Sequence, residues 1–77
     1  MVGAFVLIQA RPGASSSVGK AVGEIEGVVA AYIVTGPYDV VAHVEAEEMD
    51  RLGRLVVGKV QAVEGVTRTI TCPIIHV

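Results

Sequence analysis

Cysteine and clustered positive charge are both scarce in this 77-residue chain, and each scarcity excludes a class of protein. Cys72 is the only cysteine, so no disulfide can form within the chain, and a lone thiol fits a reducing cytoplasm. His43 and His76 have no cysteine partners at metal-ligand spacing, so we expect no structural metal and no cofactor. A domain of this size is marginal alone, and association with other chains is the remaining means of stabilisation.

Positive charge is too scattered to form a surface for nucleic acid. Six Lys and Arg against eight Asp and Glu give a net charge of −2, and the basic residues form no run, so direct DNA or RNA binding is not expected. The apolar runs at residues 4–8 and 28–34 are too short to cross a bilayer, and no positively charged segment precedes the first. We therefore expect a cytoplasmic protein with no membrane association.

Aliphatic side chains, by contrast, are abundant. Hydrophobic residues make up 52% of the chain, most of them valine, isoleucine, leucine and alanine. This fraction is high for so small a body, so part of the apolar surface has to lie on the outside of a single copy. A large exposed apolar patch usually marks an interface with another molecule.

The apolar patterns predict six elements in the order β-α-β-β-α-β. Strand-like runs occupy residues 4–8, 28–34, 38–44 and 66–77, and Pro73 places the end of the last at an edge or a bulge. The apolar stripe of the first helix is Val18, Ala21, Val22 and Ile25, and that of the second is Met49, Leu52, Val56, Val60 and Val63. A serine among residues 15–17 is expected to cap the first helix, which Gly27 ends, and acidic side chains between residues 47 and 50 begin the second.

The two halves of the chain repeat one pattern. At an offset of 38 residues, Val18, Val22 and Ile25 align with Val56, Val60 and Val63, and residues 26–28 align with residues 64–66. The repeat supports a ferredoxin-like split β-α-β arrangement of the α+β class. Right-handed crossovers then place two helices on one face of a four-stranded antiparallel sheet.

The predicted strands are apolar on both faces. Phe5 and Leu7 alternate with Val6 and Ile8, Val40 and Ala42 alternate with Val41, and Val28, Ala30, Tyr32 and Val34 alternate with Val29, Ala31 and Ile33. Strands of this kind are buried on both sides, and the helices cover only one. The simplest cover for the other side is a second copy related by two-fold symmetry, which gives a dimeric α+β barrel or sandwich.

The hairpin sequence Thr35-Gly36-Pro37-Tyr38-Asp39 resembles that of the effector-binding (RAM) domain of the Lrp/AsnC regulators. Pro12-Gly13 after the first strand, Gly27-Val28 at the second and Gly65-Val66-Thr67-Arg68-Thr69 at the fourth fit the same family, so the resemblance covers residues 1–77 as one domain. The family's usual N-terminal helix-turn-helix does not precede the first strand. The resemblance therefore implies a stand-alone ligand-binding domain with no DNA-binding part.

The resemblance further implies an oligomeric amino-acid sensor that is not an enzyme. Its dimers would assemble into a ring such as an octamer, bind a free amino acid between dimers, and could also join full-length regulators of the family. The implied ligand-binding residues are Thr35, Gly36, Tyr38, Asp39, Val66, Thr67, Arg68 and Thr69. Asp39 suits the ammonium of the ligand, and backbone N–H groups around Gly36 suit its carboxylate.

Simpler interpretations of these residues stay open. Asp39 can bond to backbone at the turn, Tyr38 can be a cross-strand packing partner, and the alternating threonines can form an ordinary strand face. A rival function is a dimeric α/β-barrel monooxygenase with the same element order. Its only candidate residues in a cavity between sheet and helices are His43, Tyr32 and Tyr38. A purely structural role alongside full-length regulators is compatible with the sensor.

Overall fold

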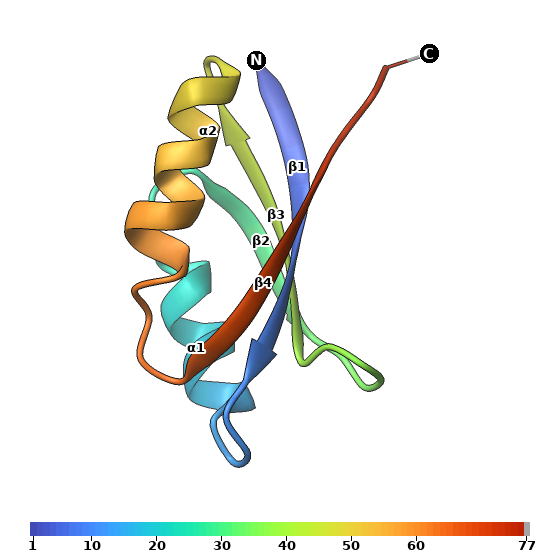
Figure 1. The fold of residues 1–77 in the computed structure, drawn as a ribbon, viewed down its shortest axis with the longest axis vertical. Coiled ribbons are helices and arrows are strands. Elements are labelled where there is room, and N and C mark those ends of the chain that lie inside the picture. Colours follow the sequence, from blue (N-terminus) through green and yellow to red (C-terminus); the bar gives the residue numbers. More distant parts are fainter. Residues whose placement is uncertain (77) are drawn as a thin grey trace.

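The computed structural model of the chain describes residues 1–76. Its elements are β1 (Val2–Ala10), α1 (Ser15–Gly23), β2 (Val28–Ile33), β3 (Val40–Ala46), α2 (Met49–Leu55), the π-helical turn η1 (Val56–Val60) and β4 (Val66–Pro73). The strands form one antiparallel sheet in the order β2-β3-β1-β4. Both helices lie on one side of this sheet (Figure 1). The predicted ferredoxin-like α+β fold is confirmed.

The core lies between the helices and the two central strands. The sheet contributes Ala4, Val6, Ile8, Val40, Ala42 and Val44, all fully buried. From the helical side come Val18 and Val22 of α1 together with Val56 and Val60 of η1, none more than 4% exposed. These four valines are two of the three helical pairs that the internal repeat aligns, and the third pair, Ile25 and Val63, is partly buried against the core. The repeated stripe is therefore the core stripe of each helix.

The second helical segment widens halfway along its length. Its α-helical part ends at Leu55, and η1 follows, with the Gln61 N–H donating to the Val56 carbonyl at 2.9 Å. Leu52 is buried as predicted, whereas Met49, at the first turn, is 47% exposed and lies outside the core. A π turn spans five residues per hydrogen bond, and no sequence pattern predicted it here.

The ends of α1 differ from the prediction. Ala14 occupies the N-cap position with no side-chain cap, and the Ser17 hydroxyl donates to the Ala14 carbonyl at 3.1 Å instead of accepting from the helix. The helix ends at Gly23 and not at Gly27. Gly27 instead takes a positive φ of 97° before β2, where an added Cβ would lie 2.9 Å from the Leu55 side chain. The positive φ favours glycine there, and the Leu55 side chain leaves little room for a Cβ without shifting.

A bulge interrupts the alternation that the sequence predicted for β2. Val28 pairs with Val44, and Ala30 pairs with His43, so Val29 is an extra residue between them. Directly paired residues share a face, so Val28 lies on the helix side and Ala30 lies on the opposite side. The sequence pattern placed both on one face, which is wrong because a shift of one residue exchanges the faces of a strand.

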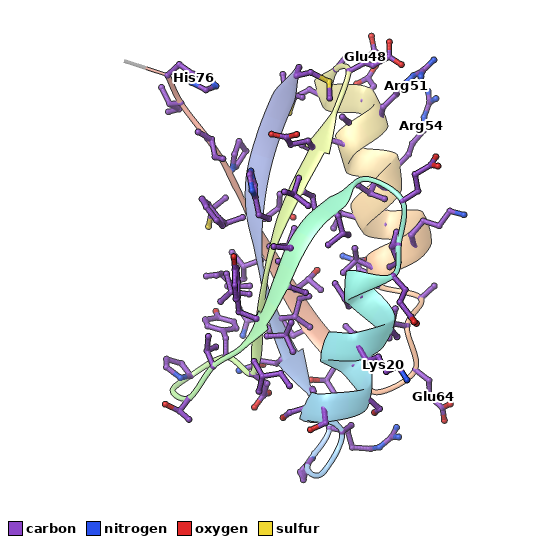
Figure 2. The ribbon with its side chains drawn as sticks, turned by 180° about the vertical axis from the view of Figure 1, so that it is seen from behind. Lys20, Glu48, Arg51, Arg54, Glu64 and His76 are labelled. Atoms are coloured by element: carbon purple, nitrogen blue, oxygen red, sulfur yellow. The ribbon has the colours of Figure 1, made fainter. Side chains whose placement is uncertain are left out.

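The side of the sheet without helices is here called the outer face. It carries Phe5, Leu7, Tyr32, Val41, His43 and Ile70, and Figure 2 shows side chains projecting from it with none of the described elements above them. Tyr32 pairs with Val41, Val41 with Leu7, and Leu7 with Ile70, so one apolar row crosses all four strands. The predicted apolar character of this side is confirmed along that row, while His43 and the paired residues Gln9 and Arg68 add polar groups to the same face.

The last strand is shorter than predicted. It ends at Pro73 on an edge of the sheet, which confirms the interruption expected from that proline. The Ile74 N–H still donates to the Gly3 carbonyl at 2.9 Å, and the chain then extends beyond the sheet (Figure 1). Val77, the predicted strand end, lies outside the described residues. Among residues 1–76, no helix has both the length and the apolar character needed to cross a membrane.

Candidate functional site

The predicted site residues belong to two segments at the same end of the sheet (Figure 1). One is the hairpin of residues 35–39 between β2 and β3, and the other is the start of β4 at residues 66–69. The C-terminal end of β1 lies between them in the sheet, where its pairing with β4 shifts register after Gln9. The end of β1 therefore decides how the two segments are placed relative to each other.

Asp39 fastens the hairpin to β1. Its Oδ2 accepts the Ala10 N–H at 2.7 Å in a half-buried position, and its own N–H donates to the Ile8 carbonyl at 2.9 Å. A hydrogen bond to a carboxylate is stronger than one between neutral groups. Asp39 therefore does bond to backbone, as one of the open interpretations has it, and its partner lies in β1. Its other carboxylate oxygen, Oδ1, has no hydrogen bond within residues 1–76.

Gln9 links both segments, and the sequence did not single it out. Its side-chain Nε2 donates to the Pro37 carbonyl at 3.0 Å, and its backbone carbonyl accepts from the Thr67 hydroxyl at 3.2 Å. Thr67 is free to make this bond because the register passes from Arg68 opposite Gln9 to Val66 opposite Ala10, leaving Thr67 as the bulged residue. The available signal was a polar residue that ends an otherwise apolar strand.

The hairpin itself is exposed. Gly36 has a φ of 131°, and a Cβ added there would meet nothing within 4 Å, so glycine serves the backbone conformation and not packing. Thr35 is exposed, and Tyr38 is half-buried. The hairpin residues are not among those that line the cavity beside the start of β4.

A cavity of about 310 Å³ lies beside the start of β4, and in a single copy it is open to solvent, with Gln61, Thr67 and Arg68 exposed. Its lining consists of Gln61, Val66, Thr67, Arg68 and Thr69, so half of the predicted site is gathered around one space. The Gln61 Nε2 donates to the Thr69 hydroxyl at 2.8 Å across it. Gln61 was missed by the sequence analysis. The signal was a departure from the internal repeat, because Gln61 has a polar side chain where its counterpart 38 positions earlier, Gly23, has none.

The lining suits a small polar or anionic molecule. The described lining residues offer one cation, two hydroxyls and one carboxamide, and no carboxylate is among them. The volume is at the lower end of the range for small-molecule sites, about 300–1,000 Å³. Within residues 1–76, no three His, Cys, Asp or Glu side chains are placed to hold a metal ion together.

His43 lies on the outer face and not between sheet and helices. Its ring stacks on Phe5 with centroids 5.1 Å apart, and its Nε2 is 3.9 Å from Glu45 Oε2. Tyr32 is on the same face and is 59% exposed. These positions do not fit the monooxygenase alternative, which requires polar groups inside a cavity between the two layers.

Comparison with known proteins assigns the chain to a family. The family model described as "Lrp/AsnC ligand binding domain" matches residues 3–77. An HTH-type transcriptional regulator of Pyrococcus furiosus, PF0250, is 32% identical over 71 residues, covering 88% of this chain and 47% of the regulator. The chain thus spans about half the length of the curated relatives that it matches.

Two solved structures resemble the chain over nearly their whole length. TTHA0845 from Thermus thermophilus has a TM-score of 0.93 and 38% identity, covering 100% of this chain and 96% of that one. The hypothetical protein PHS023 from Pyrococcus horikoshii has a TM-score of 0.90 and 28% identity, covering 99% and 92%. With the match over residues 3–77, the chain belongs to the Lrp/AsnC ligand-binding domain family, a regulatory and non-enzymatic one.

Proposed function

We propose that this domain is an oligomeric sensor that binds a free amino acid and performs no chemistry on it. The observation that carries the proposal is the cavity beside β4, because its lining includes the Val66–Thr69 segment that the predicted site contains. A free amino acid is small and carries both signs of charge. The hydroxyls and the cation of this lining match its polar groups, and the cavity volume is sufficient for one such molecule.

In this proposal the hairpin completes the site from a neighbouring copy. Thr35, Gly36 and Tyr38 lie away from the cavity of their own chain, and the Gly36 backbone is open to approach. Asp39 keeps one oxygen for the ligand ammonium while the other holds Ala10. Arg68 has no ion pair within residues 1–76, which leaves its charge for the ligand carboxylate.

A solved relative of the same fold supports an amino acid as the ligand class. The transcriptional regulator NMB0573 from Neisseria meningitidis is described as a complex with L-Met, and its TM-score to this chain is 0.85 at 17% identity. At that identity the likeness concerns the fold alone. The choice of amino acid for this chain therefore depends on its own lining residues.

We also assign the outer face to a two-fold dimer, sheet against sheet. The row of Tyr32, Val41, Leu7 and Ile70 is apolar across all four strands, and Phe5 beside it is 42% exposed. Burying such a patch is favourable in water and stabilises a domain too small to hold a large core. A ring such as an octamer, contacts with full-length regulators, and a cytoplasmic location belong to the same proposal.

Isothermal titration of the assembled protein with the twenty standard amino acids tests the sensor function. Light scattering on the same sample first establishes that copies are associated. We expect saturable heat from at least one amino acid, with the signal lost when Thr69→Val removes a hydroxyl from the cavity. If an associated sample gives no heat with any of the twenty, the sensor function is wrong.

A further inference from the structure

The π turn η1 ends where the cavity begins. Gln61 directly follows η1, and its N–H closes the five-residue loop to the Val56 carbonyl at 2.9 Å. Single π turns inside helices are rare and are often found at functional sites. Here the residue that follows the widened turn is Gln61, and among residues 1–76 it is the one lining residue of the cavity that does not belong to β4. Its Nε2 donates to the Thr69 hydroxyl at 2.8 Å.

The hydrogen bonds already present in the cavity determine which groups remain for a ligand. The Thr67 hydroxyl donates its proton to the Gln9 carbonyl, so toward a ligand it can only accept a hydrogen bond. Thr69 accepts from Gln61, so its own proton is available. Gln61 uses one of its two N–H groups and keeps the other together with its carbonyl oxygen. The cavity therefore offers a donor and an acceptor side by side on one carboxamide.

A ligand carboxamide is the group that matches this pair. It presents one acceptor and one N–H donor in a single plane, so it can bond to both groups of Gln61 at once. Gln61 and its bond to Thr69 are exposed in a single copy, so the selection operates only once the hairpin of a neighbouring copy covers the site and excludes water. A side chain with only a donor or only an acceptor then leaves one group of Gln61 unpaired, and such a site discriminates against it.

Other classes of side chain are matched less well by the same lining. Val66 is the only aliphatic residue among the described lining residues, so a leucine-like ligand finds little apolar surface. No carboxylate from residues 1–76 lines the cavity, so a lysine-like ligand finds no counter-charge. Arg68 is the one charged residue of the described lining. It leaves the edge strand β4 on the outer face, opposite to Thr69, and is left for the main-chain carboxylate that all amino acids share.

From these observations we infer that Gln61 is the specificity-determining residue of the cavity and selects an amino acid with a carboxamide side chain. The inference rests on the proposed sensor function and adds the ligand class to it. On binding, the ligand carboxamide pairs with the Gln61 carboxamide, while the main-chain carboxylate faces Arg68. The backbone bond that closes η1 fixes the position of the Gln61 Cα, so the selection is assigned to this residue and not to the exposed hairpin.

The test is isothermal titration of wild type, Gln61→Ala and Gln61→Glu with L-glutamine, L-asparagine, L-leucine, L-lysine and L-alanine. In wild type we expect one of the two carboxamides to bind most tightly. Gln61→Ala removes two neutral hydrogen bonds and is expected to weaken it about tenfold, leaving L-alanine within about twofold. Gln61→Glu keeps the chain length, removes the donors and adds a negative charge, so the preference is expected to move toward L-lysine.

Lys59→Ala is the matched control, since Lys59 is exposed in η1 and does not line the cavity. Its titration profile is expected to equal that of wild type, and a thermal melt of each variant confirms folding. Tightest binding of L-leucine by wild type, or an order of preference unchanged in both Gln61 variants, overturns the assignment of Gln61 alone. Absence of binding by every standard amino acid overturns the sensor function and this inference with it.

Discussion

The carboxylate of Asp39 holds the backbone of Ala10, with Oδ2 accepting the Ala10 N–H at 2.7 Å. Together with the Asp39 N–H bond to Ile8 and the Gln9 bond to Pro37, this contact ties the β2–β3 hairpin to the end of β1, at the point where the β1–β4 register shifts. The hairpin and the start of β4 have no direct hydrogen bond with each other among residues 1–76. Their relative position therefore depends on the end of β1.

Replacing Asp39 tests that dependence. Asp39→Ala leaves the Ala10 N–H without its partner in a half-buried position, and we expect the free energy of unfolding to fall by about 1.5 kcal/mol. Asp39→Asn keeps an acceptor oxygen of the same shape and should lose about half as much. Urea denaturation measures both. Equal stability of the alanine variant and wild type would contradict the anchoring role.

The core valines that the repeat aligns are expected to contribute equally. Val22→Ala and Val60→Ala each remove two methyl groups from a fully buried site, and each should cost about 2 kcal/mol of unfolding free energy. Val57→Ala is the control, because Val57 is 65% exposed on the same helical segment as Val60. It should leave stability unchanged or slightly higher. A loss at only one of the two buried valines would show that the halves are not equivalent.

Two glycine substitutions are predicted to act in opposite directions. Gly53 lies within α2, and an added Cβ there meets nothing within 4 Å, so Gly53→Ala should stabilise the domain by about 0.5–1 kcal/mol. Gly36 also has open space around it, but its φ is 131°, so Gly36→Ala should destabilise by about 1–3 kcal/mol. Thermal melts of the two variants give the signs. The same sign for both would mean that backbone conformation does not control Gly36.

The periodicity of the sequence was sufficient for the elements and for the apolar faces. The helical stripes marked Val18, Val22, Val56 and Val60, and each of them is buried. Alternation failed where a strand has an extra residue, at Val29 in β2 and at Thr67 in β4, because each bulge is fixed by pairing with the neighbouring strand and leaves no local mark. The predicted serine cap of α1 failed because the helix begins at Ser15 itself, so the preceding residue, Ala14, takes the N-cap position.

The polar contacts of the site depend on residues far apart in the chain. Gln9 bonds to Pro37 28 positions away and accepts from Thr67 58 positions away. No pattern of apolar residues encodes such pairs, so family resemblance supplied the Val66–Thr69 segment, while Gln9 and Gln61 were missed. The π turn before Gln61 was equally hidden, because Val56 and Val60 have the spacing of an ordinary helix.

The outer face is predicted to hold copies together. Leu7→Glu places a carboxylate at the centre of the apolar row, once in each copy, and an unpaired charge buried in an interface is strongly unfavourable. We expect multi-angle light scattering to show association in wild type and single chains in the variant at the same micromolar concentration. Val57→Glu adds the same charge on the helical side and should leave association intact. A wild-type protein that is already a single chain would contradict the dimer.

The amino-acid site at the cavity is tested most directly by NMR. Backbone amide shifts are recorded while the tightest-binding amino acid is added to the assembled, isotope-labelled protein. The account predicts that the largest changes cluster at Gln61 and at residues 66–69, with smaller changes at the hairpin of residues 35–39. Saturable changes confined to other parts of the chain, or none at all, would contradict it.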